Sequence, residues 1–150
     1  MKINITVNGK KQEWDVAADE FLSDALRRYG YTSVKIGCSD GACGVCTVML
    51  DDMPIVSCEY LAVRANGKTV LTAEGLGEEG DKIVDALVVR GGEGCGYCAP
   101  GYTVLAYAAK KELPKDATYD QVKAYLDGNL CRCTGYVVRI EALMAYLQMD

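Results

Sequence analysis

Eight cysteines in two spaced groups constrain this chain more than any other feature of its sequence. The first group comprises Cys38, Cys43, Cys46 and Cys58, and the second comprises Cys95, Cys98, Cys131 and Cys133. The 150-residue chain has no histidine, which excludes Cys/His zinc fingers, Rieske-type clusters, histidine-dependent catalytic triads and histidine-ligated haem. Because short, regular cysteine spacings in a reducing compartment favour metal ligation over disulfides, we expect the thiolates to hold metal.

The remaining sequence indicates a cytoplasmic protein. No apolar run approaches the roughly 20 residues of a membrane helix, and the first residues carry neither a signal-peptide core nor a twin-arginine signal. We therefore expect no membrane partner. The net charge is −5 at pH 7, and no cluster of Lys or Arg could neutralise phosphates, so nucleic acid is not an expected partner either.

Hydrophobic periodicity predicts an α+β domain over residues 1–74. Alternating apolar and polar residues around Asn8-Gly9 predict a β-hairpin, and a helix follows with Asp19 as its N-cap. Further short strands are expected at residues 34–36, 47–50, 55–56 and 69–72. A hairpin, a helix and then more strands are typical of the α+β class.

After a glycine-rich linker at residues 75–80, the pattern changes to four helices over residues 81–150. The second of these helices is expected to begin at Pro100, and the third carries a capping box of Thr118 and Gln121. One-sided apolar spacing indicates that the four helices form a bundle core. Domains of this size have small hydrophobic cores and often need a bound metal for stability. Four cysteines fall in each half, which is enough for one metal site in each.

The first cysteine group has the C-x4-C-x2-C…C spacing of plant-type ferredoxins. A rhombic core of two irons and two sulfides needs thiolates all around it, so three come from one tight loop and the fourth comes from elsewhere. Glycines in the loop permit positive φ and let backbone amides approach the sulfurs, which helps to set the potential. Structural zinc sites usually use C-x2-4-C knuckles, so this half indicates a [2Fe–2S] cluster.

The second cysteine group is less specific. It consists of a Cys-x2-Cys pair and a Cys-x-Cys pair, each at the entrance of a predicted helix, where amide donors and the helix dipole favour an anionic thiolate. From the residues alone, an iron–sulfur cluster, a zinc knuckle, a redox dithiol and a metal-carrier site are all open.

Three segments together resemble the iron–sulfur subunit of the xanthine oxidase family of molybdenum hydroxylases, which includes xanthine, aldehyde, nicotinate and carbon monoxide dehydrogenases. They are residues 37–48, 95–101 and 128–136. The resemblance implies a plant-ferredoxin-like β-grasp domain followed by a four-helix domain, each with one [2Fe–2S] cluster. It implies an electron-transfer subunit without an active site of its own, which relays electrons between a molybdopterin-binding large subunit and an FAD-binding medium subunit.

The same resemblance assigns roles to individual positions. The second cysteine group would hold the cluster nearer the molybdopterin, and the first group the cluster nearer FAD. Gly94 occupies a position near the pterin where the family usually has Gln, so the usual side-chain contact is absent. Ala99 stands where Thr is common, and a lost helix cap there would cost about 1 kcal/mol. Arg132, between two ligands, is expected to tune the cluster or to dock on a partner.

Two other functions are each consistent with part of the sequence. A free-standing ferredoxin would use the first cysteine group but would leave the helical domain unexplained, and a zinc-binding module would carry no electrons. The segment Gly75-x-Gly77-x-x-Gly80 matches a dinucleotide-binding fingerprint. Because the acidic residues around it would repel a pyrophosphate, we interpret it as a linker.

Overall fold

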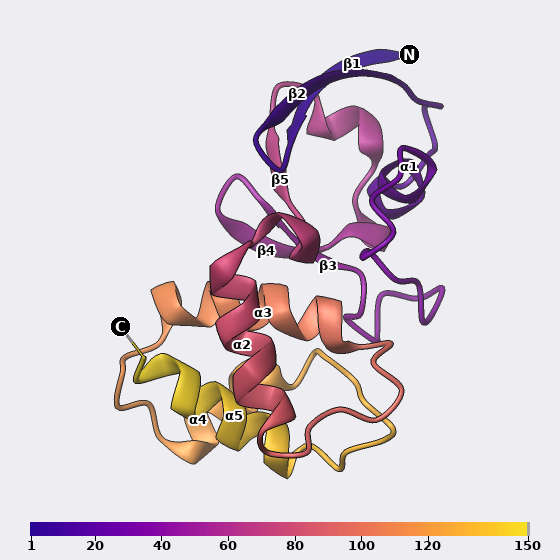
Figure 1. The fold of residues 1–150 in the computed structure, drawn as a ribbon. Coiled ribbons are helices and arrows are strands. Elements are labelled where there is room, and N and C mark those ends of the chain that lie inside the picture. The colour runs from indigo at the N-terminus through magenta and orange to yellow at the C-terminus, as the bar shows by residue number, and fades with distance from the viewer. Residues whose placement is uncertain (150) are drawn as a thin grey trace.

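The computed structural model describes residues 1–149, which form a sheet-containing half and a helical half (Figure 1). The strands are β1 (Lys2–Val7), β2 (Lys10–Asp15), β3 (Thr47–Leu50), β4 (Met53–Val56) and β5 (Thr69–Leu71). The helices are α1 (Leu22–Arg28), α2 (Glu78–Val88), α3 (Ala99–Glu112), α4 (Tyr119–Leu126) and α5 (Val137–Leu147). The sheet and α1 occupy one end of the molecule, and α2–α5 occupy the other.

The five strands form one mixed sheet in the order β2-β1-β5-β3-β4. The central pair, β1 and β5, is parallel, and the other neighbours are antiparallel. The hairpin at Asn8-Gly9 is confirmed, and both residues have the positive φ that a two-residue hairpin turn requires (51° and 78°). Asp51 and Asp52 make a second such turn between β3 and β4, with φ of 46° and 69°. The expected α+β class and β-grasp sheet are confirmed.

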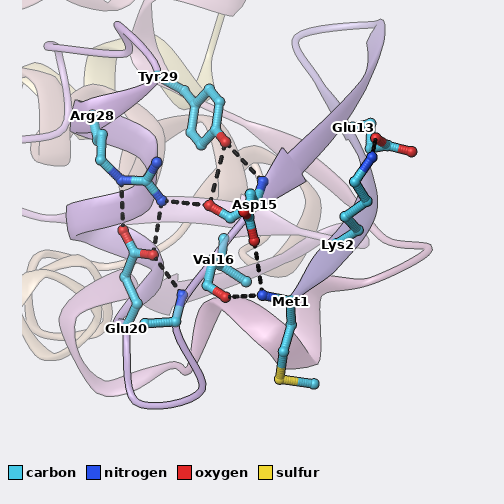
Figure 2. Close-up of polar contacts among 9 residues, drawn as sticks. Met1, Lys2, Glu13, Asp15, Val16, Glu20, Arg28 and Tyr29 are labelled. Carbon is cyan, nitrogen blue, oxygen red and sulfur yellow. Dashed lines mark hydrogen bonds and ion pairs between the residues drawn. The ribbon is translucent and has the colours of Figure 1, made fainter.

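Helix α1 packs against the sheet over an apolar core. Trp14 of β2 is buried in this core and stacks on Tyr29 at a ring-centroid distance of 4.4 Å. Figure 2 shows how the end of α1 is attached to β2: Arg28 forms an ion pair with Glu20 at 2.8 Å and donates a hydrogen bond to the Asp15 carbonyl at 2.8 Å. These contacts fix the helix that precedes the first cysteine loop.

Two local expectations in this half are wrong. Asp19 does not cap α1; the N-cap is Phe21, whose side chain makes no capping bond, and the Leu22 amide donates instead to the Tyr60 carbonyl. Residues 34–36 do not form a strand. Val34 is buried in the core all the same, and its carbonyl accepts a hydrogen bond from Arg27 at 2.7 Å, so the backbone is satisfied without a sheet partner.

The four expected helices of the other half are confirmed as α2–α5. The capping box of Thr118 and Gln121 is present at the start of α4. Helix α3 begins at Ala99 with Cys98 as its N-cap. A Thr at position 99 would therefore not cap this helix, and the loss of stability expected from Ala99 does not arise. Residues 78–80, expected in the linker, form the start of α2. No helix within residues 1–149 is long and apolar enough to cross a membrane.

A small apolar cluster joins the two halves. Met49 of β3 and Leu76, which precedes α2, pack with Val104 and Ala108 of α3. The start of α3 also lies directly against the first cysteine loop, because a Cβ at Gly101 would be 2.7 Å from the Val45 carbonyl oxygen. The fold therefore brings the first cysteine loop into contact with the helical half.

Candidate iron–sulfur sites

The first cysteine group occupies a loop before β3 and a short turn after β4. Cys46 is buried, while Cys38, Cys43 and Cys58 are partly buried. The Cys43 amide nitrogen lies 3.4 Å from the Cys38 Sγ, and the thiols of Cys46 and Cys38 both lie close enough to Cys58 to raise its pKa. The structure thus brings the four residues of this group together.

Backbone amides in the loop point at the sulfurs. Amides of Asp40 and Cys43 donate to Cys38 and lower the pKa of its thiol. Burial raises the pKa of Cys58 to about 12, and the hydrogen bond with Cys46 adds to this shift. Amide donors of this kind offset the negative charge of thiolates and sulfides in iron–sulfur sites.

The second cysteine group lies around one pocket beside the start of α3. Cys95, Cys98, Cys131 and Cys133 all line this pocket. Cys131 is buried and Cys98 is partly buried, whereas Cys95 and Cys133 are exposed. The pocket therefore joins two cysteines from the segment before α3 with two from the segment before α5.

The electrostatics of the second pocket favour a thiolate at Cys131. Burial by itself raises the pKa of this thiol, but the Thr134 hydroxyl, 3.3 Å from the sulfur, and the amides of Cys133 and Thr134 bring it down to about 7. Burial raises the pKa of Cys98 to about 11, against the effect of the Arg139 charge. The Cys131 amide donates to the Tyr136 hydroxyl at 3.1 Å.

The two non-cysteine positions singled out in the sequence differ in their surroundings. Gly94 lines the second pocket, and a Cβ there would lie 2.6 Å from the Cβ of Cys133. This backbone has no space for a side chain at position 94, so any contact with a pterin would come from the backbone. Arg132 is exposed and makes no hydrogen bond or ion pair with another residue in the described part of the chain.

The donor set fits a two-iron cluster. The second site brings four thiols around one pocket, the first site brings four cysteines together from a loop and a short turn, and a plant-type [2Fe–2S] core is held by four cysteine thiolates. In addition, Nε of Arg139 is buried without a hydrogen-bond partner among these residues, and Arg139 lines the second pocket. A cluster sulfur is an acceptor that such a donor could use.

Three residues that join these sites, Arg139, Asn129 and Tyr97, were not among the predicted site residues, and Tyr97 was expected to pack within the helical domain. Arg139 is only 2% exposed although it lies on α5, and it donates to the side chain and carbonyl of Asn129. Tyr97, between Cys95 and Cys98, donates to the Ile36 carbonyl at 2.8 Å. For Arg139, the sequence signal was a charged residue within the apolar segment that forms α5.

Comparisons with known proteins agree with this geometry. Residues 5–74 match the family described as a 2Fe-2S iron-sulfur cluster binding domain, and residues 72–144 match the family described as a [2Fe-2S] binding domain. The nicotinate dehydrogenase small FeS subunit of Eubacterium barkeri is 39% identical over 147 residues, which cover 96% of this chain and 92% of that protein.

Two further matches extend over nearly the whole chain. The xanthine dehydrogenase iron-sulfur-binding subunit of Escherichia coli O157:H7 is 38% identical over 145 residues, covering 95% of this chain and 91% of that protein. The crystal structure of quinoline 2-oxidoreductase from Pseudomonas putida 86 superposes with a TM-score of 0.92 at 38% identity, covering 99% of this chain and 94% of the matched chain. The chain therefore belongs to the electron-transferring iron–sulfur subunits of the xanthine dehydrogenase family of molybdenum hydroxylases.

Proposed function

We propose that this chain holds two [2Fe–2S] clusters and relays electrons between a molybdopterin-binding large subunit and an FAD-binding medium subunit in the cytoplasm. Cys38, Cys43, Cys46 and Cys58 ligate the first cluster, and Cys95, Cys98, Cys131 and Cys133 ligate the second. When bound, the clusters supply one-electron redox chemistry. The chain supplies the thiolates, the amide donors and the fixed separation of the two sites.

The convergence of the cysteines at two sites carries this proposal. In the first site, the Cys43 amide nitrogen lies 3.4 Å from the Cys38 Sγ, and Cys46 lies close enough to Cys58 to raise the pKa of its thiol. In the second site, Cys95, Cys98, Cys131 and Cys133 line one pocket, so each group would supply four thiolates to one cluster. Both sets include amide donors aimed at sulfur, as thiolate-bound clusters require.

Exposed apolar side chains support a large partner beside the second site. Val88 and Val89 at the end of α2 are 51% and 82% exposed, and Leu130 and Val137 are 46% and 50% exposed. These residues flank the segments that carry the second cysteine group. Because exposed apolar side chains mark interaction surfaces, we propose that the molybdopterin subunit docks on this half. The FAD subunit would then lie nearer the first site.

Metal analysis of cysteine variants tests the ligand assignment. The chain with its clusters should contain four irons and four acid-labile sulfides. Cys38→Ser should remove the first cluster and Cys133→Ser the second, and each should halve the iron content. Ser39→Ala alters an exposed side chain beside Cys38 and should leave the iron content unchanged. Zinc in place of iron, or only two irons in the unaltered chain, would contradict the proposal.

Co-purification tests the partner assignment. Val89→Asp should release the large subunit from the complex while the iron content stays at four. The matched control is Met53→Asp on β4, which replaces an apolar side chain of comparable exposure (64%) in the other half and should retain that subunit. A chain that purifies alone with all its iron and binds neither partner would support a free-standing ferredoxin instead.

A further inference from the structure

The two cysteine segments are joined by three hydrogen bonds. The Leu130 amide donates to the Cys43 carbonyl at 2.9 Å, the Asn129 side-chain amide donates to the Gly44 carbonyl at 3.0 Å, and the Tyr97 hydroxyl donates to the Ile36 carbonyl. The first of these hydrogen bonds links the two sites most directly. Cys43 belongs to the first cysteine group, and Leu130 is the chain neighbour of Cys131, which belongs to the second.

We propose that Asn129, locked in place by Arg139, is a positioning residue for electron transfer between the two clusters. It keeps the Leu130 amide on the Cys43 carbonyl, and this hydrogen bond completes a path of bonds from the Cys131 sulfur to the Cys43 sulfur. The inference rests on the proposed function. Electron tunnelling decays less steeply through covalent and hydrogen bonds than across a gap, so the contact favours this route.

One electron crosses the path in each event. The site that gives the electron is oxidised by one unit and the site that receives it is reduced by one unit. No covalent bond forms or breaks, and no proton needs to move. The role of the protein is therefore to hold the two ends of the path at a fixed distance.

Asn129 is held from both sides. Its side chain is only 1% exposed, and its Oδ1 and carbonyl accept hydrogen bonds from Arg139 at 2.5 and 3.2 Å. The Arg139 guanidinium in turn lies over the ring of Tyr102, 4.5 Å from its centroid, and the Tyr102 hydroxyl donates to the Arg139 carbonyl at 2.9 Å. A buried network is rigid when its hydrogen bonds are satisfied, and a cluster sulfur would be the acceptor for the one donor left over, Nε of Arg139.

The backbones themselves meet beside this network. A Cβ at Gly44 would lie 2.0 Å from the Gly128 carbonyl oxygen, so residues 43–44 and 128–130 are in direct backbone contact. The Asn129 side chain adds a hydrogen bond to the Gly44 carbonyl beside this contact, and so helps to hold the two segments in alignment. This alignment places the Leu130 amide opposite the Cys43 carbonyl.

The decisive variant is Asn129→Asp in the full chain with both clusters. The carboxylate keeps an acceptor for Arg139 but loses the donor to Gly44 and faces that carbonyl with an oxygen. We expect four irons, faster hydrogen–deuterium exchange in the peptide containing Leu130, and a several-fold slower electron exchange between clusters after flash photoreduction, compared at the driving force given by the measured potentials of both clusters in each variant. The matched control is Tyr97→Phe, which removes a bond between the same segments outside the path and should leave the rate unchanged.

Arg139→Lys is the second variant, because it keeps a buried cation but cannot hold both acceptors of Asn129. It should slow inter-cluster transfer in the same direction, and it serves as the test if Asn129→Asp fails to fold. An unchanged rate despite faster Leu130 exchange would overturn the inference, as would an equal slowing in Tyr97→Phe. A wild-type chain without two reducible clusters would overturn the proposed function instead, so the two failures are distinguishable.

Discussion

Replacement of Gly44 by alanine tests how tightly the two cysteine segments are packed. Gly44 has φ of 66°, and its added Cβ would lie 2.0 Å from the Gly128 carbonyl oxygen and 3.2 Å from the Asn129 Cα. These neighbours are backbone atoms, which cannot rotate away as the end of a side chain can. The two segments must therefore separate to admit the methyl group.

The expected cost has two parts. A non-glycine residue in the left-handed region costs about 1–2 kcal/mol. Separation also weakens the hydrogen bonds from Leu130 to Cys43 and from Asn129 to Gly44, each worth about 0.5–1.5 kcal/mol net. Together these effects destabilise Gly44→Ala by about 2–5 kcal/mol.

Gly41→Ala is the matched control in the same loop. Gly41 has φ of 71°, but its Cβ would meet only the exposed side chain of Glu59, 2.6 Å from Oε1. That side chain can move away, so only the backbone cost of about 1–2 kcal/mol applies. The two variants should therefore differ by about 1–3 kcal/mol, the value of the two hydrogen bonds between the segments.

Thermal melting of the chain with its clusters measures this difference. For a chain of this size, 1 kcal/mol shifts Tm by about 2–4 °C, so Gly44→Ala should melt about 2–12 °C below Gly41→Ala. Visible absorbance reports whether the clusters are still bound. Equal melting temperatures for the two variants, at equal iron content, would refute the reasoning that backbone contact joins the two sites.

Three further predictions concern single contacts. Thr118→Ala removes the capping box of α4 and should lower Tm by the equivalent of about 1 kcal/mol; an unchanged Tm would contradict this. The Lys110 ammonium, by hydrogen bonding, lowers the pKa of Glu79 to about 2, so its stabilisation is complete above about pH 4.5 and is lost as the pH falls toward 2. Glu79→Gln should therefore melt lower than the wild type at pH 7, and the gap, followed by circular dichroism, should close in that acidic range rather than widen. Gly94→Ala places a methyl group 2.6 Å from the Cβ of Cys133, so the Cys133 segment must shift to admit it and Tm should fall while the iron content stays at four, because the family usually carries Gln at this position; an unchanged Tm would contradict this.

Much of the local structure could be predicted because its causes lie within a few residues. Asn8 and Gly9 accept positive φ, which is the requirement of a two-residue hairpin turn. Thr118 and Gln121 satisfy each other's backbone amides at the start of α4. The expectations that failed depended on distant partners: the amide at the start of α1 is satisfied by Tyr60 and not by Asp19, and residues 34–36 find their partners outside any strand.

The sequence by itself determined the type of donor atoms and their spacing within each segment, because the C-x4-C-x2-C loop and the paired cysteines are set by the chain over one or two turns. Only the tertiary structure decided that Cys43 and Leu130 meet and that Arg139 is buried behind Asn129. These contacts depend on how closely two backbones approach, and that approach requires glycine at position 44, where a Cβ would lie 2.0 Å from the Gly128 carbonyl oxygen. Such packing is a property of the two halves together, so no local pattern in either half encodes it.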